Sequence, residues 1–509
     1  MNRSFSQQLP INLITNIISF VLSVGISIFM TPFYLNKVGI DGLGILRLAL
    51  TFPMYTSLIT IFITGSVTRY LTIALQEKNN HEAKIILNTS FFTLLFLTVI
   101  LIPIMFFVSF NAELFFNFPE HFSKETTWLF LAVFATSLVS LLSSIFMIPA
   151  LAFNRLDISN VVKIISTISQ TALIILLLHF FSNISMVGAA FLTGAFITLG
   201  LSLYIKRKLT PELTISKAYF DKIIFHKIAS TGSWLIVTHL STLLFLYSDL
   251  WVVNHFFGAN GTGEFSIGLQ WSTMFQQMSS VFIGLLAPVI MITYAQKEFQ
   301  KLYNVLTLGI KFTGLMLAIP IGIIAGFANP LLSLWLGKEY AYLDTLLWAM
   351  LLPQVVFLAV VPLFIAFNAY NQVKKPAIVS VGMGVLRLGL AIVFSYTLNL
   401  GIYAVVIAGI IIGILKDGLF IPIYAAQTMK VESTIFIKAL FPGILMASLT
   451  FFLSFYMSTI FQPDKWLILI IVMGGAGATM VLMTWLFFLK SEERTIILRT
   501  FLKKFRQNG

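Results

Sequence analysis

The sequence contains no cysteine among its 509 residues. Disulfide bonds, thiol catalysis and cysteine metal sites are therefore excluded. Charged residues are also scarce, at 10% of the chain, whereas soluble globular chains contain about 25%. Hydrophobic residues make up 58% and the mean hydropathy is +0.95. This composition is typical of a membrane protein.

Enzymatic motifs are missing as well. No glycine-rich phosphate loop precedes a soluble helix, so the sequence offers no ATP-binding site, and no histidine pair has metal-ligand spacing. The longest outer connections, about 110–126 and 328–342, are too short to hold the substrate and acids of a membrane polymerase or glycosyltransferase. We therefore expect neither an enzyme nor a metal site.

Long apolar segments are abundant. A membrane-spanning helix needs about 20 apolar residues, and we identify fourteen such segments, the first of them too long for a cleavable signal peptide. They lie at about 11–35, 43–73, 85–109, 127–152, 160–181, 185–205, 231–256, 263–294, 302–327, 343–368, 376–397, 401–427, 437–461 and 465–489. The predicted fold class is an all-α polytopic membrane protein with 14 transmembrane helices.

The net charge is +13, and the positive residues gather on one side of the predicted spans instead of forming a nucleic-acid-binding surface. Twenty-three of the 32 Lys and Arg residues fall in the termini and in the loops on the same side, four lie on the opposite side, and five are within or at the edges of spans. By the positive-inside rule, both termini are cytoplasmic. An even number of spans requires the same arrangement.

In four predicted spans, polar side chains and two glycines recur at steps of three, four, seven or ten residues. Each set falls on one helix face at a period of 3.6 residues. The sets are Asn12, Asn16, Ser19 and Ser23; Arg47, Thr51, Tyr55, Gly65 and Arg69; Thr231, Thr238, Thr242 and Asp249; and Ser266, Gln270, Thr273, Gln277 and Gly284. Lipid cannot solvate such faces, so they are expected to meet one another or to line a water-filled cavity.

The chain also repeats part of its own pattern. Four glycines recur 219 residues later without a gap, as Gly39 and Gly258, Gly42 and Gly261, Gly44 and Gly263, and Gly65 and Gly284. We expect the first three of each set to form an outer turn between spans. Residues 152–154 (Ala-Phe-Asn) recur at 366–368 with offset 214. The duplication predicts two parallel six-helix repeats.

The predicted divisions follow from this repeat. They are an N-terminal lobe at 1–205, a cytoplasmic linker at 206–230, a C-terminal lobe at 231–427, a helix hairpin at 428–489 and a cytoplasmic amphipathic tail at 490–509.

These residues resemble the multidrug/oligosaccharidyl-lipid/polysaccharide (MOP) exporter superfamily, and within it the Wzx-type O-antigen and polysaccharide-biosynthesis flippases. The resemblance rests on Asn12, Ser19, Thr31-Pro32-Phe33-Tyr34, Val38-Gly39-Ile40-Asp41-Gly42-Leu43-Gly44, Gly65 with Arg69-Tyr70, and Asn154-Arg155. It implies two pseudo-symmetric six-helix lobes around a central polar cavity lined by spans 1, 2, 7 and 8, plus a C-terminal helix pair.

The resemblance further implies a function. Family members move an undecaprenyl-diphosphate-linked oligosaccharide, such as an O-antigen repeat unit of lipopolysaccharide biosynthesis, from the cytoplasmic to the periplasmic leaflet of the bacterial inner membrane. Partners implied by the family are the lipid-linked oligosaccharide, a polysaccharide polymerase and a chain-length regulator. Nucleic acid is not expected.

The chemistry of this cargo selects candidate residues. The diphosphate needs fixed cations, for which Arg is well suited, and the glycan needs amide and hydroxyl partners. The candidate substrate-binding residues are Arg47, Arg69, Arg387, Asn12, Asn16, Gln270 and Gln277. Asp249 is the carboxylate on the four polar stripes. No cofactor is expected apart from a coupling Na⁺ or H⁺, which Asp249 would bind. The alternative role of Asp249 is that of a structural partner of an arginine.

Other readings stay open. Arg47 and Arg69 are equally well explained as interfacial anchors, and Arg387 lies too deep for that and is expected to be buried in a functional or paired role. Lys311 is expected to extend towards the cytoplasm, and Lys416 and Asp417 to mark a frayed helix end. The alternative functions are a lipid II flippase of peptidoglycan synthesis and a drug/cation antiporter of the same superfamily. The antiporter would need acidic residues in the cavity, whereas the four polar helix faces contain Asp249 as their acidic residue and two arginines, Arg47 and Arg69.

Overall fold

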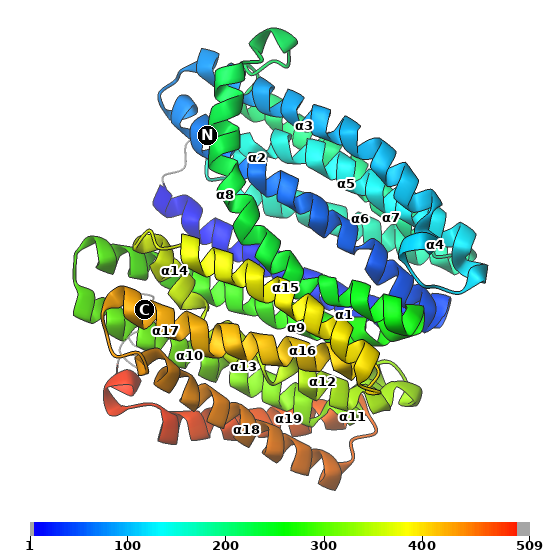
Figure 1. Ribbon diagram of the computed structural model, residues 1–509, viewed down its shortest axis with the longest axis vertical. Helices are drawn as coiled ribbons and strands as arrows, with labels where there is room; N and C mark the ends of the chain where they lie inside the picture. The colour runs from blue at the N-terminus through cyan, green and yellow to red at the C-terminus, as the bar shows by residue number, and fades with distance from the viewer. Residues whose placement is uncertain (1–4, 496–509) are drawn as a thin grey trace. The chain divides into compact units, whose positions relative to one another are not determined.

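The computed structural model describes the backbone of residues 5–495 and, within that range, all side chains except those of residues 5–7, 9, 231–238, 241, 242, 246 and 285. The regular elements in this range are helices (Figure 1). Those up to residue 266 are α1 (Phe5–Ala49), α2 (Thr51–Gln76), α3 (Asn80–Phe110), α4 (Ala112–Phe115), η1 (Glu120–Phe122), α5 (Ser123–Ala152), α6 (Leu156–Phe180), α7 (Ser185–Leu209), η2 (Lys217–Tyr219), α8 (Lys222–Leu246) and the start of α9 (Ser248–Ala295).

The later helices are shorter and more often interrupted. They are α10 (Phe299–Gly326), α11 (Ala328–Trp335), η3 (Lys338–Leu343), α12 (Asp344–Leu351), α13 (Gln354–Ala359), α14 (Val361–Ala369), α15 (Lys374–Thr397), α16 (Tyr403–Gly413), η4 (Ile414–Phe420), α17 (Ile421–Met429), α18 (Ile435–Phe461), α19 (Trp466–Met483) and η5 (Thr484–Phe488). The predicted span at 343–368 is broken into α12, α13 and α14, because Pro353 and Pro362 lack the amide hydrogen that a continuous helix needs.

Twelve helical segments of the described range are long and apolar enough to cross a membrane. The all-α membrane fold is therefore confirmed, whereas the predicted count of fourteen is not. Two of the twelve are much longer than a single crossing requires: residues 10–76 form a 67-residue stretch and residues 243–295 a 53-residue stretch. The predicted amphipathic tail at 490–509 lies largely beyond the described residues.

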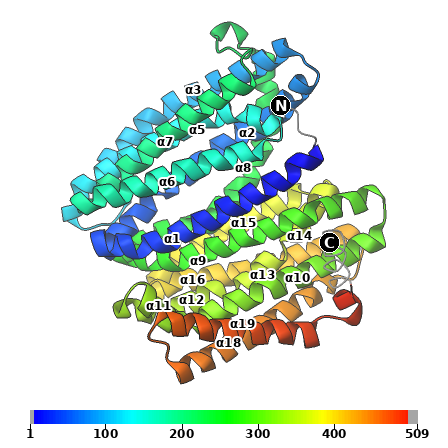
Figure 2. The same cartoon turned by 180° about the vertical axis from the view of Figure 1, so that it is seen from behind.

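The chain forms two compact units. The first contains residues 1–266 and 384–405, and the second contains residues 267–383 and 406–509. In the first unit, α2, α3 and α5 lie side by side around a core that includes Ile63, Leu87 and Ile145, and α6 packs against α7 (Figure 2). In the second, α10 packs along α18 beside a core that includes Leu306, Phe367 and Phe436. The lobe boundaries predicted at 206–230 and 428 stay a prediction.

The glycine repeat marks two breaks between helices. Gly39 interrupts α1 with φ 71° and ψ −178°, and Gly258 interrupts α9 with φ 68° and ψ −167°. Only glycine adopts this backbone region readily, because it has no Cβ to clash with the chain. The helix resumes directly after each break, so the connection expected at 39–44 is made at Gly39 alone, and Gly42 and Gly44 already lie in the next helix.

The third pair of glycines makes a reciprocal contact within the first unit. A Cβ on Gly44 would meet the carbonyl oxygen of Ala259, and a Cβ on Gly263 would meet the carbonyl oxygen of Ile40. Residues 40 and 44 are related to 259 and 263 by the same offset of 219. The two repeats therefore touch through equivalent backbone, and each position has room for hydrogen alone.

Two further backbone features recur at nearly the same offset. Lys78 and Lys297 both adopt a positive φ, at 56° and 59°, and are 219 residues apart. Asn154 and Asn371 do the same, at 55° and 54°, with offset 217. The amides that follow them close the same helix-ending bond, Arg155 to Ala150 and Gln372 to Phe367, both at 2.8 Å. The match of residues 152–154 to 366–368 is therefore out of register by three residues.

Candidate functional site

Asp249 and Arg387 form a buried ion pair within the first unit. The Arg387 Nε donates a hydrogen bond to Asp249 Oδ1 at 3.2 Å, and Nη2 donates to Oδ2. The residues are 138 positions apart and come from the start of α9 and the middle of α15, both within candidate spans. The side chain of Asp249 is 4% exposed and that of Arg387 is 16% exposed. The paired role predicted for Arg387 is what the structure has, and the ion-coupling role of Asp249 stays a prediction.

Small and aromatic residues set the geometry of this pair. Gly384 lies one helical turn before Arg387 on α15, where a Cβ would come within 2.9 Å of Leu244 Cβ and 3.5 Å of the Phe245 ring. The missing side chain lets α15 approach the end of α8 closely. The Arg387 guanidinium then lies 5.4 Å from the centre of the Phe245 ring, in cation–π contact. The guanidinium is held between a carboxylate and an aromatic face.

The energetic reason for the pairing is the membrane. A lone charge at the centre of a spanning helix costs about 2.5–3.5 kcal/mol on insertion scales. A forked carboxylate contact satisfies two donors of the guanidinium at once. Pairing also cancels most of the net charge that burial penalises, so either residue alone would be more costly than both together.

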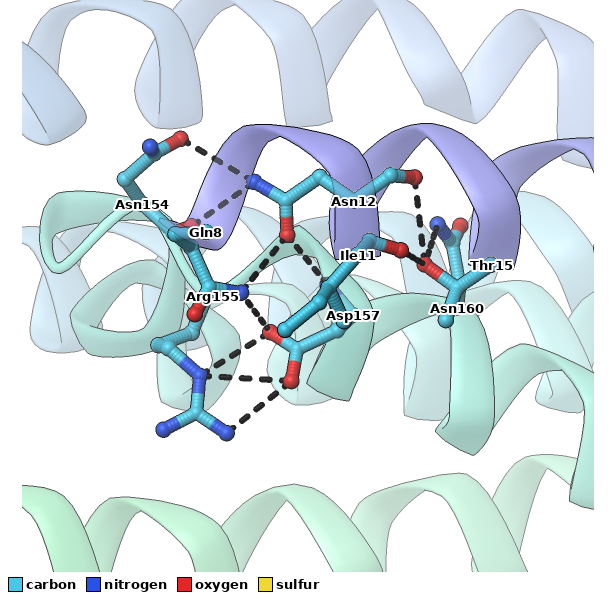
Figure 3. A network of polar contacts seen from close by, with 8 residues as sticks. All are labelled: Gln8, Ile11, Asn12, Thr15, Asn154, Arg155, Asp157 and Asn160. Carbon is cyan, nitrogen blue, oxygen red and sulfur yellow. Dashed lines mark hydrogen bonds and ion pairs between the residues drawn. The ribbon is translucent and has the colours of Figure 1, made fainter. Parts of the chain in front are cut away.

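Asn12 belongs to a polar network at the start of α1 (Figure 3). Its Nδ2 donates to the Asn154 carbonyl oxygen at 2.9 Å, and its Oδ1 accepts from the Asp157 backbone amide at 3.1 Å and from Gln8 Nε2 at 2.9 Å. Gln8 also donates to Asp157 Oδ1 at 2.8 Å. The network ties α1 to the connection between α5 and α6, which gives Asn12 a positioning role.

Arg155 completes this network. Its Nη2 lies 2.9 Å from Asp157 Oδ2, and its Nε donates to Oδ1 at 2.9 Å. The hydrogen bond with Asp157 raises the pKa of the Arg155 guanidinium above its ordinary value. In the sequence, Asn154-Arg155 carried only the family resemblance. The link of this turn to the start of α1 was not predicted, because Gln8 and Asp157 are 149 residues apart in the chain.

The remaining candidates lie on several helices, in different environments. Asn16 on α1, Arg69 on α2 and Gln277 on α9 are exposed, Arg47 is half-buried, and Gln270 is 4% exposed. Arg47 lies after the break at Gly39 and Arg69 lies on α2. Between them Leu50 keeps α-helical backbone angles (φ −70°, ψ −6°) and its amide donates to the Leu46 carbonyl oxygen at 3.0 Å, so the chain runs almost without interruption from one arginine to the other. The side chains of Thr231, Thr238 and Thr242 lie outside the described residues.

Two charged pairs were not predicted. Lys311 Nζ lies 2.7 Å from Oε2 of Glu493, a residue beyond the last predicted span, and the two side chains are 13% and 8% exposed. The extension of Lys311 towards the cytoplasm stays a prediction. Lys416 and Asp417 do not mark a frayed end: they lie in η4, a π-helical segment inside the span 403–429, with Nζ 3.3 Å from Oδ2. Adjacent side chains do not face each other on a regular α-helix, whereas in this π-helical segment the two charged groups are in contact.

No cluster of three or more His, Asp or Glu side chains in the described part of the chain could hold a metal ion. No family model matches the sequence.

The chain is similar to two bacterial membrane proteins. It is 26% identical over 494 residues to the uncharacterized membrane protein EpsK of Bacillus subtilis (strain 168), covering 97% of this chain and 98% of EpsK. It is 21% identical over 372 residues to a putative O-antigen transporter of Shigella flexneri, covering 72% of this chain and 86% of that protein.

The fold is similar to solved transporter structures. The lipid II flippase MurJ in an inward closed conformation matches with a TM-score of 0.66 and 16% identity over 93% of this chain and 98% of MurJ. An inward-facing multidrug resistance MATE family transporter of the MOP superfamily matches with a TM-score of 0.63 and 16% identity, over 81% and 95%.

In sequence the chain is similar to a putative O-antigen transporter, and in fold to transporters of the MOP superfamily, which confirms the resemblance seen in the sequence. The named proteins to which it is similar are transporters and a lipid II flippase rather than enzymes.

Proposed function

We propose that the protein is a flippase that moves an undecaprenyl-diphosphate-linked oligosaccharide, such as an O-antigen or similar surface-polysaccharide repeat unit, from the cytoplasmic to the periplasmic leaflet. The observation that carries the proposal is a set of arginines within candidate spans, with Arg387 partly accessible and Arg69 exposed. A diphosphate is recognised by such fixed, forked cations. The similarity to a putative O-antigen transporter supports the same cargo class.

The polar side chains on the same helices suit the glycan. Asn16 and Gln277 are exposed on segments that a membrane would surround. Lipid offers an amide no hydrogen-bond partner, whereas water and sugar hydroxyls do. In this proposal these amides contact the oligosaccharide while Arg47, Arg69 and Arg387 serve the diphosphate.

The proposed topology has fourteen crossings and two cytoplasmic termini. At a rise of 1.5 Å per residue, 67 and 53 helical residues extend about 100 and 80 Å, well beyond a hydrocarbon core of about 30 Å. Each stretch also contains a kinked glycine. The mechanism that two repeats favour is alternating access. Coupling to a Na⁺ or H⁺ gradient through Asp249 would then require the carboxylate to leave Arg387 during the cycle.

A lipid II flippase is the second candidate, favoured by the coverage of 93% of this chain and 98% of MurJ. A drug/cation antiporter is the third. It would need acidic groups to attract cations, and in the part of the chain that the structure describes Asp249 is already paired with Arg387.

Purified protein in proteoliposomes distinguishes the three. Outward movement is measured as exposure of the cargo headgroup to an impermeant reagent, for a lipid-linked oligosaccharide, for lipid II and for a fluorescent cationic drug. We expect movement of the lipid-linked oligosaccharide to exceed that in empty liposomes by at least tenfold. Movement of the cationic drug alone would refute the proposal, and preference for lipid II would select the second candidate.

A further inference from the structure

The geometry points to Asp249 as an internal competitor of the cargo for Arg387. In this inference, which rests on the proposed function, Asp249 occupies the guanidinium in the empty carrier and an incoming phosphate or diphosphate group takes its place. When the cargo leaves, the carboxylate returns. No covalent bond changes: one forked, charge-assisted pair is exchanged for another.

The exposure of the two partners is the first argument. Arg387 is 16% exposed, whereas Asp249 is 4% exposed. An approaching ligand therefore reaches the guanidinium before it reaches the carboxylate. The accessible group is the one that binds anions.

The donor count is the second argument. A guanidinium carries five N–H donors in a planar fork, and the Asp249 carboxylate takes donors on Nε and Nη2. A phosphate has the same bidentate geometry as a carboxylate and carries more charge. Because Phe245 supports one face of the guanidinium, the cation stays in place while its anionic partner is exchanged.

The Asp249 carboxylate also lowers the apparent affinity of Arg387 for cargo, because it is part of the same chain. A tethered carboxylate is present at high effective concentration, so the fraction of Arg387 free to bind cargo is small. The apparent dissociation constant of the cargo is raised by the inverse of that fraction. A carrier needs such a device, because a cargo that binds too tightly is not released on the other side of the membrane.

Neutralising the Asp249 carboxylate should increase the affinity of the protein for a diphosphate. The probe is farnesyl diphosphate, with farnesol as the control that lacks the anion. The variants are Asp249→Asn, Arg387→Gln and the double variant. The matched control is Glu493→Gln, which breaks another ion pair of low exposure, between Glu493 and Lys311 of candidate span 299–326.

We expect Asp249→Asn to bind farnesyl diphosphate about tenfold or more tightly than the wild type. Glu493→Gln should bind like the wild type, and the double variant like Arg387→Gln. A purely structural ion pair would give no gain. An Asp249→Asn protein that binds with wild-type or weaker affinity overturns the inference, as does an equal gain for farnesol.

A measurement on the wild-type protein covers the case in which Asp249→Asn does not fold. A hydrophobic carbodiimide labels carboxyl groups, and labelling of Asp249 is read by mass spectrometry. Farnesyl diphosphate should increase labelling of Asp249, because the ligand displaces it from Arg387. Unchanged or decreased labelling would contradict the inference. If farnesyl diphosphate binds neither the wild type nor any variant, the proposed diphosphate cargo fails instead.

Discussion

At the scale of single residues, two asparagines on α1 have opposite environments although they are one helical turn apart. Asn12 is 6% exposed and makes hydrogen bonds to Asn154, Asp157 and Gln8. Asn16 is exposed. The same spacing rule selected both from the sequence, because periodicity assigns a helix face but cannot tell which part of that face meets protein.

Replacing Asn12 with Ala should destabilise the protein by about 1–3 kcal/mol, because the partly buried Asp157 amide and Asn154 carbonyl each lose their hydrogen-bond partner. Thermal unfolding in detergent measures the effect. Asn16→Ala is the matched control, expected to keep the wild-type melting temperature and to reduce cargo movement. A larger stability loss in Asn16→Ala than in Asn12→Ala would contradict this assignment.

Arg69 tests the cargo contact separately from the ion pair. Arg69→Ala should lower cargo movement in proteoliposomes by about tenfold or more, and Arg69→Lys should recover part of it where charge suffices but not a forked contact. Lys301→Ala, which removes an exposed cation paired with Glu298, is the control and should be neutral. Normal movement by Arg69→Ala would leave Arg69 an interfacial anchor.

At this scale the sequence identified which charges are unusual but not their partners. Asp249 and Arg387 stood out as charged groups in apolar segments. Pairing was among the alternatives for each of them, but the sequence did not identify them as each other's partner. Their pairing depends on helices 138 residues apart in the chain. The partner of Lys311 was beyond prediction for the same reason, since Glu493 follows the last predicted span.

At the scale of elements, most helix ends were predictable because apolar runs stop where polar turns begin. The predicted span at 185–205 corresponds to α7 (Ser185–Leu209) and that at 160–181 to α6 (Leu156–Phe180). The failures lie where the backbone is irregular. From composition alone, η4 and the segment that contains α12, α13 and α14 cannot be distinguished from regular apolar helices, since prolines do not always break a spanning helix.

The close contacts of Gly44 with Ala259 and of Gly263 with Ile40 give a prediction at the scale of elements. Gly44→Ala and Gly263→Ala should each destabilise the protein by about 1–3 kcal/mol, because the added Cβ meets a backbone carbonyl that cannot move aside as a side chain does. Thermal unfolding is again the measurement.

Gly25→Ala is the control for both substitutions. Gly25 lies on α1 with nothing within 4 Å of an added Cβ, so this change should be neutral or stabilising by about 0.5–1 kcal/mol. Equal melting temperatures for Gly25→Ala and Gly44→Ala would show that the crossing tolerates a methyl group.

At the scale of the whole molecule, the topology rests on the positive-inside rule and is tested most directly by labelling. The cysteine-free chain accepts single cysteines without a background signal. Lys297→Cys should react with an impermeant maleimide only from the cytoplasmic side, and Lys338→Cys only from the periplasmic side. Both positions are exposed. Reversed labelling of the two would invert the proposed orientation.

The reciprocal contact of Gly44 with Ala259 and of Gly263 with Ile40 has the form of an interface between two identical subunits. In such an interface, residue i of one copy meets residue j of the other, and j meets i. The ancestor of this chain would then have been a single repeat that paired with itself in the membrane. Fusion of its two gene copies would have made that pairing permanent, after which each half was free to acquire charges, such as Asp249 and Arg387, that the other half lacks.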